Sequence, residues 1–430
     1  MTQLPVSIVI VSRQRPDKLK LCLTGIAQLC YPAFEVVVVT DADSIAAIQT
    51  LPFATLLKLI PFEEGNISSA RNLGVAHAAG EVIAFIDDDA VPEPTWLTHL
   101  ITPFAQSDIG AAGGYVRGRN GISYQWQGRC VDERGYKTTL AFSDDAPRIF
   151  RPQADSALKT EGTNMAVRRA VLVDLGGFDP AYHFFLDETD LNLRLAQAGY
   201  AVALVPRAQV HHSFSPSVRR RQDRTPLDIF DIGASWAVFQ RKFVPTRYRA
   251  HHWRTIRATE RARVMGFLID GRAEPGLTRA LLKRLDLGYS QGMDRRVNSG
   301  SIPDQPLTPF APFPSSDGAH IFICARSWDA KVAREKARAA RQDGAIVTLL
   351  LLSPTALYHH ARFHSDGYWE QRGGQFGKST RSNPLFWPWS FRARCDKERI
   401  RIERTRVLDH PFEQAKKVAR QRQRSGDLAG

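Results

Sequence analysis

Three consecutive aspartates, Asp87, Asp88 and Asp89, directly follow the apolar run of residues 82–86. Such a run is typical of a buried strand, and in an open parallel α/β sheet ligands bind at the carboxyl ends of the strands. Crowded carboxylates repel one another unless a cation neutralises them, and hard oxygen ligands suit magnesium or manganese, which can hold a diphosphate. Taken alone, the triplet is explained equally well as a solvated acidic turn that opens a helix near Trp96.

Polar side chains also follow other apolar runs near the start of the chain. Ser12 and Arg15 come after a first run, Asp41 comes after a second, and Arg71 lies where a helix pattern opens. A helix N-terminus with an arginine suits a phosphate. Each residue has an ordinary alternative role as a turn, a cap or a solvent-facing side chain. Their placement at successive strand ends of one parallel sheet nevertheless favours a shared ligand crevice.

A second acidic group lies a hundred residues further on. Asp187, Glu188 and Asp190 precede an amphipathic helix pattern, and acids at a helix N-terminus are stabilising on their own. Beside a metal-bound diphosphate, such a carboxylate can instead be the general base for an incoming hydroxyl. His211 and His212 follow a predicted strand. A histidine is more often structural than a ligand, but imidazole coordinates metals when carboxylates are near.

The elements that must position these residues alternate between strand and helix over the first two hundred residues. Helix patterns begin near Pro16 and near Ser68. The order predicts a mostly parallel sheet with right-handed crossovers. The predicted strands are Val6–Val11, Phe34–Val39, Ala54–Ile60 and Glu81–Ile86, followed later by Gly110–Arg117 and Tyr200–Val205.

The rest of the chain differs in composition. We expect a basic helical extension over 216–300, a proline-rich linker over 301–318, and a small C-terminal α/β region over 319–430. That region shows a strand, helix, strand pattern and a basic tail from 410 onward. The first domain then covers 1–215.

Composition narrows the class of protein. The 430 residues are 43% hydrophobic, enough for a substantial core, and carry a net charge of +14. Residues 218–263 hold twelve Lys/Arg against four Asp/Glu, an excess that could meet nucleic acid, anionic lipid or a phosphorylated substrate, or simply be solvated. Five cysteines without metal-ligand spacing imply no disulfide framework and favour a reducing cytoplasm. No apolar stretch reaches the length of a membrane span, so we expect a cytoplasmic, soluble or peripheral protein.

The ordered motifs resemble the family 2 glycosyltransferases of the GT-A fold, an inverting class that uses nucleotide-diphosphate sugars. The resemblance covers roughly residues 4–215. It rests on the stretches Val6–Pro16, Tyr31–Asp41, Gly65–Gly74, Gly80–Leu97, Gly162–Arg169, Gly176–Asp179 and Leu186–His212.

The resemblance implies roles residue by residue. Asp41 is similar to the nucleotide-contacting acid, Arg71 to the donor-site arginine, and the aspartate triplet to the Asp-x-Asp motif that holds a divalent ion. The chain departs from the family at Thr40-Asp41-Ala42 and at Asp187-Glu188, which stands where Glu-Asp is usual, so either acid can be the base. The implied site residues are Glu188, Asp187 and Asp190 for catalysis, Ser12, Arg15, Asp41, Arg71, Asp87 and Asp88 for the donor, and Asp87, Asp89, His211 and His212 for the metal.

The function expected on this basis is sugar transfer from a nucleotide diphosphate to an acceptor hydroxyl with inversion, supported by magnesium or manganese. The expected acceptor is a saccharide or a lipid-linked intermediate of bacterial surface polysaccharide or glycolipid assembly. Peripheral contact with the anionic inner face of the plasma membrane is compatible with the charge, and nucleic acid is not expected in the acidic crevice. One alternative is a nucleotidyltransferase acting on sugar phosphates, although the loop 12–16 lacks the glycines of a phosphate loop. Another is a catalytically silent protein that binds nucleotide sugars or nucleic acid.

Overall fold

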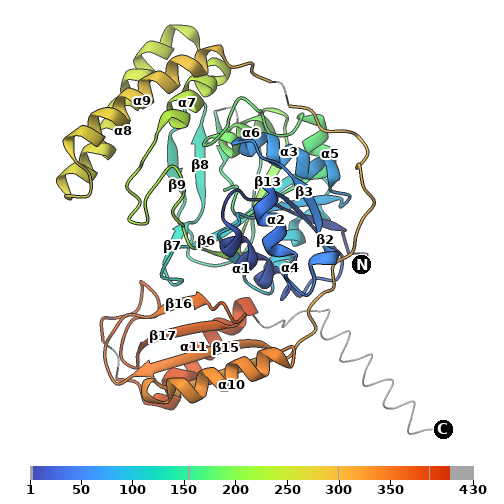
Figure 1. The fold of residues 1–430 in the computed structure, drawn as a ribbon, viewed down its shortest axis with the longest axis vertical. Helices are drawn as coiled ribbons and strands as arrows, with labels where there is room; N and C mark the ends of the chain where they lie inside the picture. Colours follow the sequence, from blue (N-terminus) through green and yellow to red (C-terminus); the bar gives the residue numbers. More distant parts are fainter. Residues whose placement is uncertain (1–2, 154, 299, 387, 407–430) are drawn as a thin grey trace.

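The chain forms an N-terminal α/β body, a helical arm and a smaller C-terminal α/β unit (Figure 1). The computed structural model describes residues 3–153, 155–298, 300–386 and 388–406. The basic tail predicted from 410 onward lies outside the described residues.

One half of the central sheet is parallel, as the sequence predicts. Its strand order is β3-β2-β1-β4, with helices between successive strands. The predicted third strand begins later than expected, because residues 54–56 form a short 3-10 turn, η1. The elements are β1 (Val6–Val11), α1 (Pro16–Ile26), β2 (Phe34–Thr40), α2 (Ala42–Ile48), β3 (Lys58–Pro61), α3 (Ile67–His77) and β4 (Val82–Phe85).

The other half of the sheet is mixed and continues in the order β4-β12-β6-β13-β10. Strand β12 runs antiparallel to both β4 and β6, whereas β13 runs parallel to β6. The elements are β5 (Ala90–Pro92), α4 (Trp96–Ile101), η2 (Thr102–Ala105), β6 (Ile109–Arg117), β7 (Tyr124–Trp126), β10 (Arg148–Phe150), β12 (Met165–Arg168), α5 (Arg169–Asp174), α6 (Asp187–Gln197) and β13 (Ala201–His212).

The predicted irregular region of residues 118–160 contains a small antiparallel sheet beside the main one. Its order is β11-β8-β9. These strands are β8 (Arg129–Asp132), β9 (Lys137–Thr139) and β11 (Ser156–Leu158). The mixed α/β class with a largely parallel central sheet, predicted from the strand and helix pattern, is confirmed.

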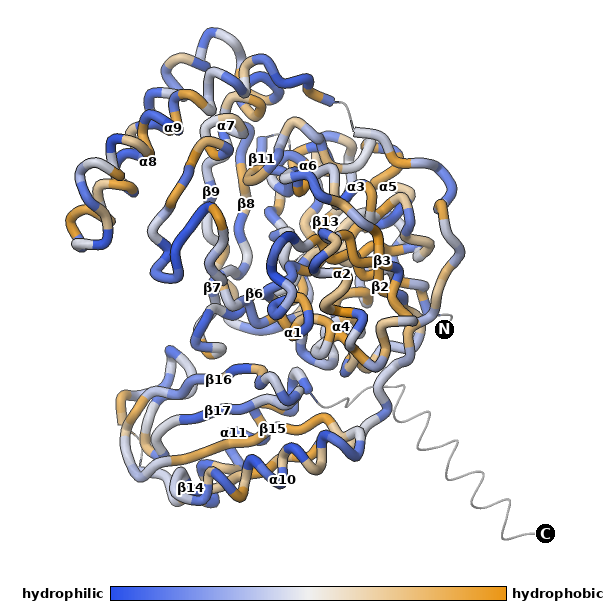
Figure 2. Tube along the Cα trace, in the orientation of Figure 1, coloured by the Kyte–Doolittle hydropathy of each residue, from blue (hydrophilic) through white to orange (hydrophobic). Residues whose placement is uncertain are grey.

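The core lies on both faces of the central sheet because its central strands are mostly apolar on both faces. In β1, Ile8 and Ile10 pack into one cluster with α1, whereas Val9 packs into a second cluster with α3. Figure 2 shows the hydrophobic colouring concentrated around β2 and β3. This rigid double-sided core fixes where each strand ends, and the candidate residues follow those ends.

Three helices form the arm that projects from the body (Figure 1). They are α7 (Phe230–Phe243), α8 (Thr246–Ile269) and α9 (Pro275–Asp294). Helices α7 and α9 approach closely at Gly233 and Gly288, where an added methyl group would overlap the facing backbone. At the other end of α7, Lys242 forms ion pairs with Asp179 and Asp190 of the body.

The C-terminal unit has a four-stranded sheet in the order β14-β15-β17-β16, with β16 antiparallel to β17. The strand, helix, strand start predicted for this region is present. Its elements are β14 (His320–Arg326), η3 (Ser327–Asp329), α10 (Ala330–Gln342), β15 (Ile346–Ser353), β16 (His360–Phe363), β17 (Trp369–Gly374) and α11 (Phe391–Arg406). The proline-rich segment before it lies along the body, where the Phe313 amide donates to the Phe34 carbonyl over 2.7 Å.

A disulfide joins Cys324 of β14 to Cys395 of α11, which corrects the expectation drawn from the cysteine count. The two residues are 71 positions apart, and only the packing of α11 against the C-terminal sheet brings them together. Disulfides are unusual in reducing compartments, so the cytoplasmic location stays a prediction. Among the described residues no helix is both long and apolar enough to cross a membrane.

Candidate active site

The carboxyl ends of β1, β2 and β4 meet at one edge of the sheet and carry Ser12, Asp41 and Asp87 within one or two residues of each strand. The strands are parallel, so their ends coincide as predicted. The long strand β13 ends at the same place, and pairs there with β5 so that His212 lies opposite Ala90. Most of the candidate functional residues therefore lie at this edge of the sheet.

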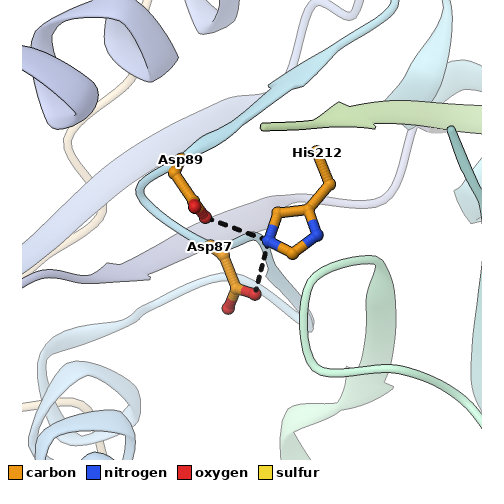
Figure 3. Close-up of side chains that lie close together, drawn as sticks. All are labelled: Asp87, Asp89 and His212. Atoms are coloured by element: carbon orange, nitrogen blue, oxygen red, sulfur yellow. Dashed lines mark ion pairs between the residues drawn. The ribbon is translucent and has the colours of Figure 1, made fainter. Parts of the chain in front are cut away.

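Asp87, Asp89 and His212 form the cluster that fits a divalent cation (Figure 3). Each offers one ligand atom, and these atoms lie within 4.8 Å of one another. His212 Nε2 is 3.1 Å from Asp89 Oδ1 and 4.0 Å from Asp87 Oδ2. Two carboxylates and an imidazole are a donor set that manganese and magnesium accept. Asp87 is the most open of the three, with 28% of its side chain exposed, so the cluster faces solvent on one side.

The segment after β13 orients Asp89. The Ser215 amide donates to Asp89 Oδ2 over 2.7 Å, and the Ser213 amide donates to the Asp89 carbonyl. Burial raises the pKa of Asp89, but the contacts with His212 and Arg15 outweigh it and hold that pKa well below its usual range. Asp89 is therefore ionised at neutral pH, as a metal ligand must be.

Asp88, predicted at the donor, points into the protein instead of toward the cluster. Its side chain is fully buried, accepts from Ser12 Oγ over 2.6 Å and pairs with Arg15 at 2.5 Å. Burial raises the pKa of Asp88 to about 7 in spite of Arg15. Residues 87–90 form a turn, in which the Ala90 amide donates to the Asp87 carbonyl over 3.0 Å. In this turn the middle aspartate points inward and fastens the end of β1 to the triplet. Arg15 remains partly exposed beside the cluster.

Asp41 caps α2 and holds the loop after β1. Its carboxylate accepts from the Ser44 amide over 3.0 Å and from the Gln14 amide over 2.7 Å. Burial raises the pKa of Asp41, but these hydrogen bonds have the larger effect, so that pKa lies below its usual value. Asp41 therefore shapes the loop that carries Arg15.

Arg71 connects the aspartate triplet to the second acidic group. Its guanidinium contacts Asp187 and lies 3.6 Å from Asp87 Oδ1. An added methyl group at Gly162 would overlap this guanidinium, so the glycine makes room for Arg71. The fold thus brings two acidic motifs a hundred residues apart to opposite sides of one buried arginine.

Glu188 pairs with a lysine that the sequence did not single out. Lys159 Nζ is 2.9 Å from Glu188 Oε1 and 2.7 Å from Glu161 Oε2. Burial raises the pKa of Glu188, but Lys159 outweighs it, so that pKa falls to about 2. Burial and the charge of Glu188 raise the pKa of Asp187. Glu188 keeps 19% of its side chain exposed against 3% for Asp187, so Glu188 is the acid that an acceptor can reach.

The turn into α6 is strained. Phe185 and Leu186 have φ angles of 73° and 66°, in the left-handed region that non-glycine residues avoid. Leu186 is buried in the core against α7, which holds the turn in place. Strain of this kind collects at functional sites, and here it directs the first two residues of α6 toward Arg71 and Lys159.

Two predicted residues lie outside the cluster. Asp190 is fully buried and pairs with Arg194 at 2.6 Å and with Lys242 at 2.5 Å, so it has no access to an acceptor. His211 faces away from the aspartates because neighbouring strand residues point to opposite faces. Its Nε2 lies 2.8 Å from Glu93 Oε1. Asp190 is thus a structural ion-pair residue, and His212 alone completes the metal cluster.

Sequence reasoning missed Lys159, Gly162 and Glu93. Gly162 opens the stretch Gly162–Arg169 that carries part of the resemblance, but nothing in that stretch reveals contact with Arg71. Lys159 lies in a region without periodicity, so no pattern placed it beside the acids. Glu93 follows the triplet by four residues and reads as an ordinary surface acid.

Comparison with known proteins adds to this geometry. The model of the family described as "Glycosyltransferase like family 2" matches residues 4–225. An O-antigen biosynthesis protein, RfbC, from Myxococcus xanthus is 28% identical over 51% of this chain and 18% of its own length. The glycosyltransferase AglE from Haloferax volcanii is 24% identical over 46% of this chain and 63% of its own length. The chain therefore spans less than two thirds of these curated relatives.

Among solved structures, the mannosyltransferase PcManGT from Pyrobaculum calidifontis in complex with GDP-Man and Mn²⁺ aligns with a TM-score of 0.40 and 17% identity, covering 68% of this chain and 88% of that one. The family match covers more than half of the chain, including every residue of the aspartate and histidine cluster and the acids of α6. The chain belongs to the family 2 glycosyltransferases.

Proposed function

We propose that the chain transfers a sugar from a nucleoside diphosphate to an acceptor hydroxyl, with inversion at the anomeric carbon. The observation that carries the proposal is the position of Arg71 between the two acidic groups. It contacts Asp187 on one side and lies 3.6 Å from Asp87 on the other. A diphosphate at the cluster and an acceptor at α6 would therefore meet across this arginine.

One group of residues is proposed to bind the donor, and another to act on the acceptor. Asp87, Asp89 and His212 would hold a magnesium or manganese ion, and Arg71 and Arg15 add positive charge beside it. When bound, the ion would neutralise negative charge on the leaving diphosphate. Asp41 supports the loop 12–15 and is proposed to contact the nucleoside.

Glu188 is proposed as the general base. It accepts the proton of the acceptor hydroxyl while the acceptor oxygen bonds to the anomeric carbon and the bond from that carbon to the diphosphate oxygen breaks. Attack from the face opposite the leaving group inverts the configuration. Lys159 keeps Glu188 ionised and fixes its orientation, and Asp187 holds Arg71. The division follows from exposure, because Asp187 is nearly enclosed whereas Glu188 is partly open.

Glu188→Gln tests this assignment. We expect sugar transfer to fall by about 10² to 10⁴ while the affinity for the nucleotide changes little, because the base acts only on the acceptor. Glu133→Gln, in the turn between β8 and β9, is the control and should leave transfer unchanged. Full transfer by both Glu188→Gln and Asp187→Asn would contradict the acid pair as the source of the base.

The donor and the metal can be tested without knowing the acceptor. Thermal unfolding with UDP, GDP or dTDP, each with and without manganese, should show one nucleotide that stabilises the protein only when manganese is present. Asp89→Asn should abolish this dependence on manganese. Equal stabilisation with and without manganese would argue against the metal cluster.

The acceptor is proposed to be a saccharide or a lipid-linked saccharide in bacterial surface polysaccharide or glycolipid assembly. One relative acts in O-antigen biosynthesis, and another is an N-acetylglucosaminyl-diphospho-decaprenol L-rhamnosyltransferase from Mycobacterium tuberculosis, 37% identical over 59 residues. Because the chain covers only a small part of both, the acceptor is best identified by screening saccharide and polyprenyl-linked acceptors against the donor found above.

The arm is proposed to contact the anionic inner face of the plasma membrane. Arg254, Arg261 and Arg279 are exposed on α8 and α9, and Ile269 at the end of α8 is 81% exposed. Basic side chains beside an exposed apolar one suit an anionic lipid surface. Vesicles with anionic lipid should co-sediment the protein and neutral vesicles should not. The double variant Arg254→Glu/Arg261→Glu should lose this binding, while Arg151→Glu/Arg207→Glu on the body should keep it.

A further inference from the structure

One buried arginine of the C-terminal unit contacts the residues that lie behind the candidate metal site. Arg406, in the last described turn of α11, pairs with Glu93, with Nε 2.7 Å from Oε2 and Nη2 3.1 Å from Oε1. Glu93 is 2% exposed and Arg406 is 5% exposed, so neither charge has water as an alternative partner. Arg406 is 313 positions from Glu93 in the sequence, and it comes from a different structural unit.

Glu93 connects this arginine to the strand pair that carries the metal cluster. Its Oε1 lies 2.8 Å from His211 Nε2, and its amide donates to the Gln209 carbonyl over 3.0 Å. His211 precedes His212, and the pairing of β13 with β5 sets Val91 opposite His211 and Ala90 opposite His212. Asp89 is the residue before β5. Asp89 and His212 therefore lie at one end of this strand pair, and Glu93 holds its other end together with the side chain of His211.

The C-terminal unit also packs around the same contact. Arg406 lies over the ring of Trp369, 4.2 Å from its centroid, and the His211 ring is 4.6 Å from that ring. Arg406 donates to Thr348 Oγ1 over 3.0 Å, and Thr95 Oγ1 donates to the Thr405 carbonyl over 2.6 Å. The arginine is thus fixed by β15, β17 and α11, and it presents a fixed fork to Glu93.

We propose that Arg406 and Glu93 are positioning residues for the metal site, so that the C-terminal unit sets how tightly the body holds its divalent cation. This rests on the proposed metal site of Asp87, Asp89 and His212. The fork of Arg406 holds Glu93, Glu93 holds His211, and the β5–β13 pair then keeps Asp89 and His212 at the separation seen here. Groups that orient metal ligands from behind commonly change metal affinity by about 10- to 100-fold.

The test is manganese affinity, measured as free Mn²⁺ by electron paramagnetic resonance in the full chain with its preferred nucleotide. Arg406→Met keeps the apolar stem over Trp369 and removes the fork, and we expect it to weaken manganese binding about tenfold. Arg406→Lys, which keeps the charge, should recover part of the loss. Arg399→Met is the matched control, because Arg399 forms a partly exposed pair with Glu403 on the same helix. The manganese affinity of this variant should equal that of the unmodified protein.

A second readout separates positioning from a general loss of structure. The transfer rate of Arg406→Met should return close to that of the unmodified protein at saturating manganese, because the catalytic groups are intact. If Arg406→Met does not fold, Glu93→Gln, which keeps the shape of the side chain, takes its place with the same expected direction. A folded variant with unchanged manganese affinity would overturn the proposal. Failure of the unmodified protein to bind manganese would instead contradict the metal site itself.

Discussion

At the scale of single residues, the site combines acids whose ionisation is set by different neighbours. Glu188 has its pKa lowered to about 2 by Lys159, against the effect of burial. A base with so low a pKa is ionised throughout the neutral range, but it accepts a proton weakly. Lys159 therefore keeps Glu188 ionised and fixes its orientation, at the cost of making Glu188 a weaker base.

Lys159→Met tests this role. Without the cation, the pKa of Glu188 should rise, so a smaller fraction is ionised at low pH. The acidic limb of the transfer rate against pH should move to a pH higher by about 1 to 2, as loss of a close opposite charge usually does. Because Lys159 is buried, its loss also costs stability, and Lys137→Met is the milder variant with the same direction, since Lys137 also lowers the pKa of Glu188. An acidic limb that stays in place in both variants would show that another group limits the rate.

The candidate functional residues could be named from the sequence because their types and their positions after apolar runs are local properties. The residues that they contact could not be named in this way. Asp87 and Asp88 are neighbours in the chain, yet one is open and the other is fully buried. Which of them faces a ligand depends on the path of the turn, and no sequence pattern records that path. The same holds for Lys159, whose contact with Glu188 depends on how the irregular region folds.

At the scale of elements, continuous apolar runs predicted the parallel half of the sheet and most of its strands, because a strand buried on both faces is apolar at most of its positions. The antiparallel insertion of β12 between β4 and β6 was not predicted, since the pattern of β12 is the same for either direction. The close packing of α7 on α9 was also invisible, because a glycine within a helix pattern signals only lower helix propensity.

Gly288→Ala tests that packing. The added methyl group would overlap the Phe230 carbonyl oxygen, so α9 must move away from α7, and we expect the free energy of unfolding to fall by about 1 to 3 kcal/mol. Gly276→Ala is the matched control in the same helix, because nothing lies near the added methyl group, and it should raise stability by up to about 1 kcal/mol. Urea unfolding followed by circular dichroism measures both. Equal effects would mean that the two helices do not meet at Gly288.

At the scale of the whole molecule, buried ion pairs hold the C-terminal unit together and join it to the body. Glu93 joins Arg406 across the contact between the two, and Glu398 lies inside the C-terminal unit beside Arg394 and Arg401. Burial raises the pKa of both acids, but the arginines outweigh it. They hold the pKa of Glu93 well below its usual range and lower that of Glu398 to about 2. Buried pairs of a glutamate with arginines thus stabilise both the C-terminal unit and its contact with the body.

This arrangement predicts that acid destabilises the protein. A carboxyl whose folded pKa lies below its unfolded value contributes stability above the unfolded pKa, and that stability is lost as the pH falls toward the folded pKa. For Glu398 the interval runs from 4.5 to about 2, which corresponds to about 3 kcal/mol. Urea unfolding followed by tryptophan fluorescence should therefore show a lower free energy of unfolding at pH 3 than at pH 6. Glu398→Gln should be less stable than the unmodified protein at pH 6, and the gap should narrow at pH 3, because there the acid is already protonated in the unfolded chain and must take up charge on folding. Glu403→Gln, on the same helix, should follow the unmodified protein at both values. If the difference caused by Glu398→Gln were the same at both values, buried carboxylates would not be what fastens the C-terminal unit.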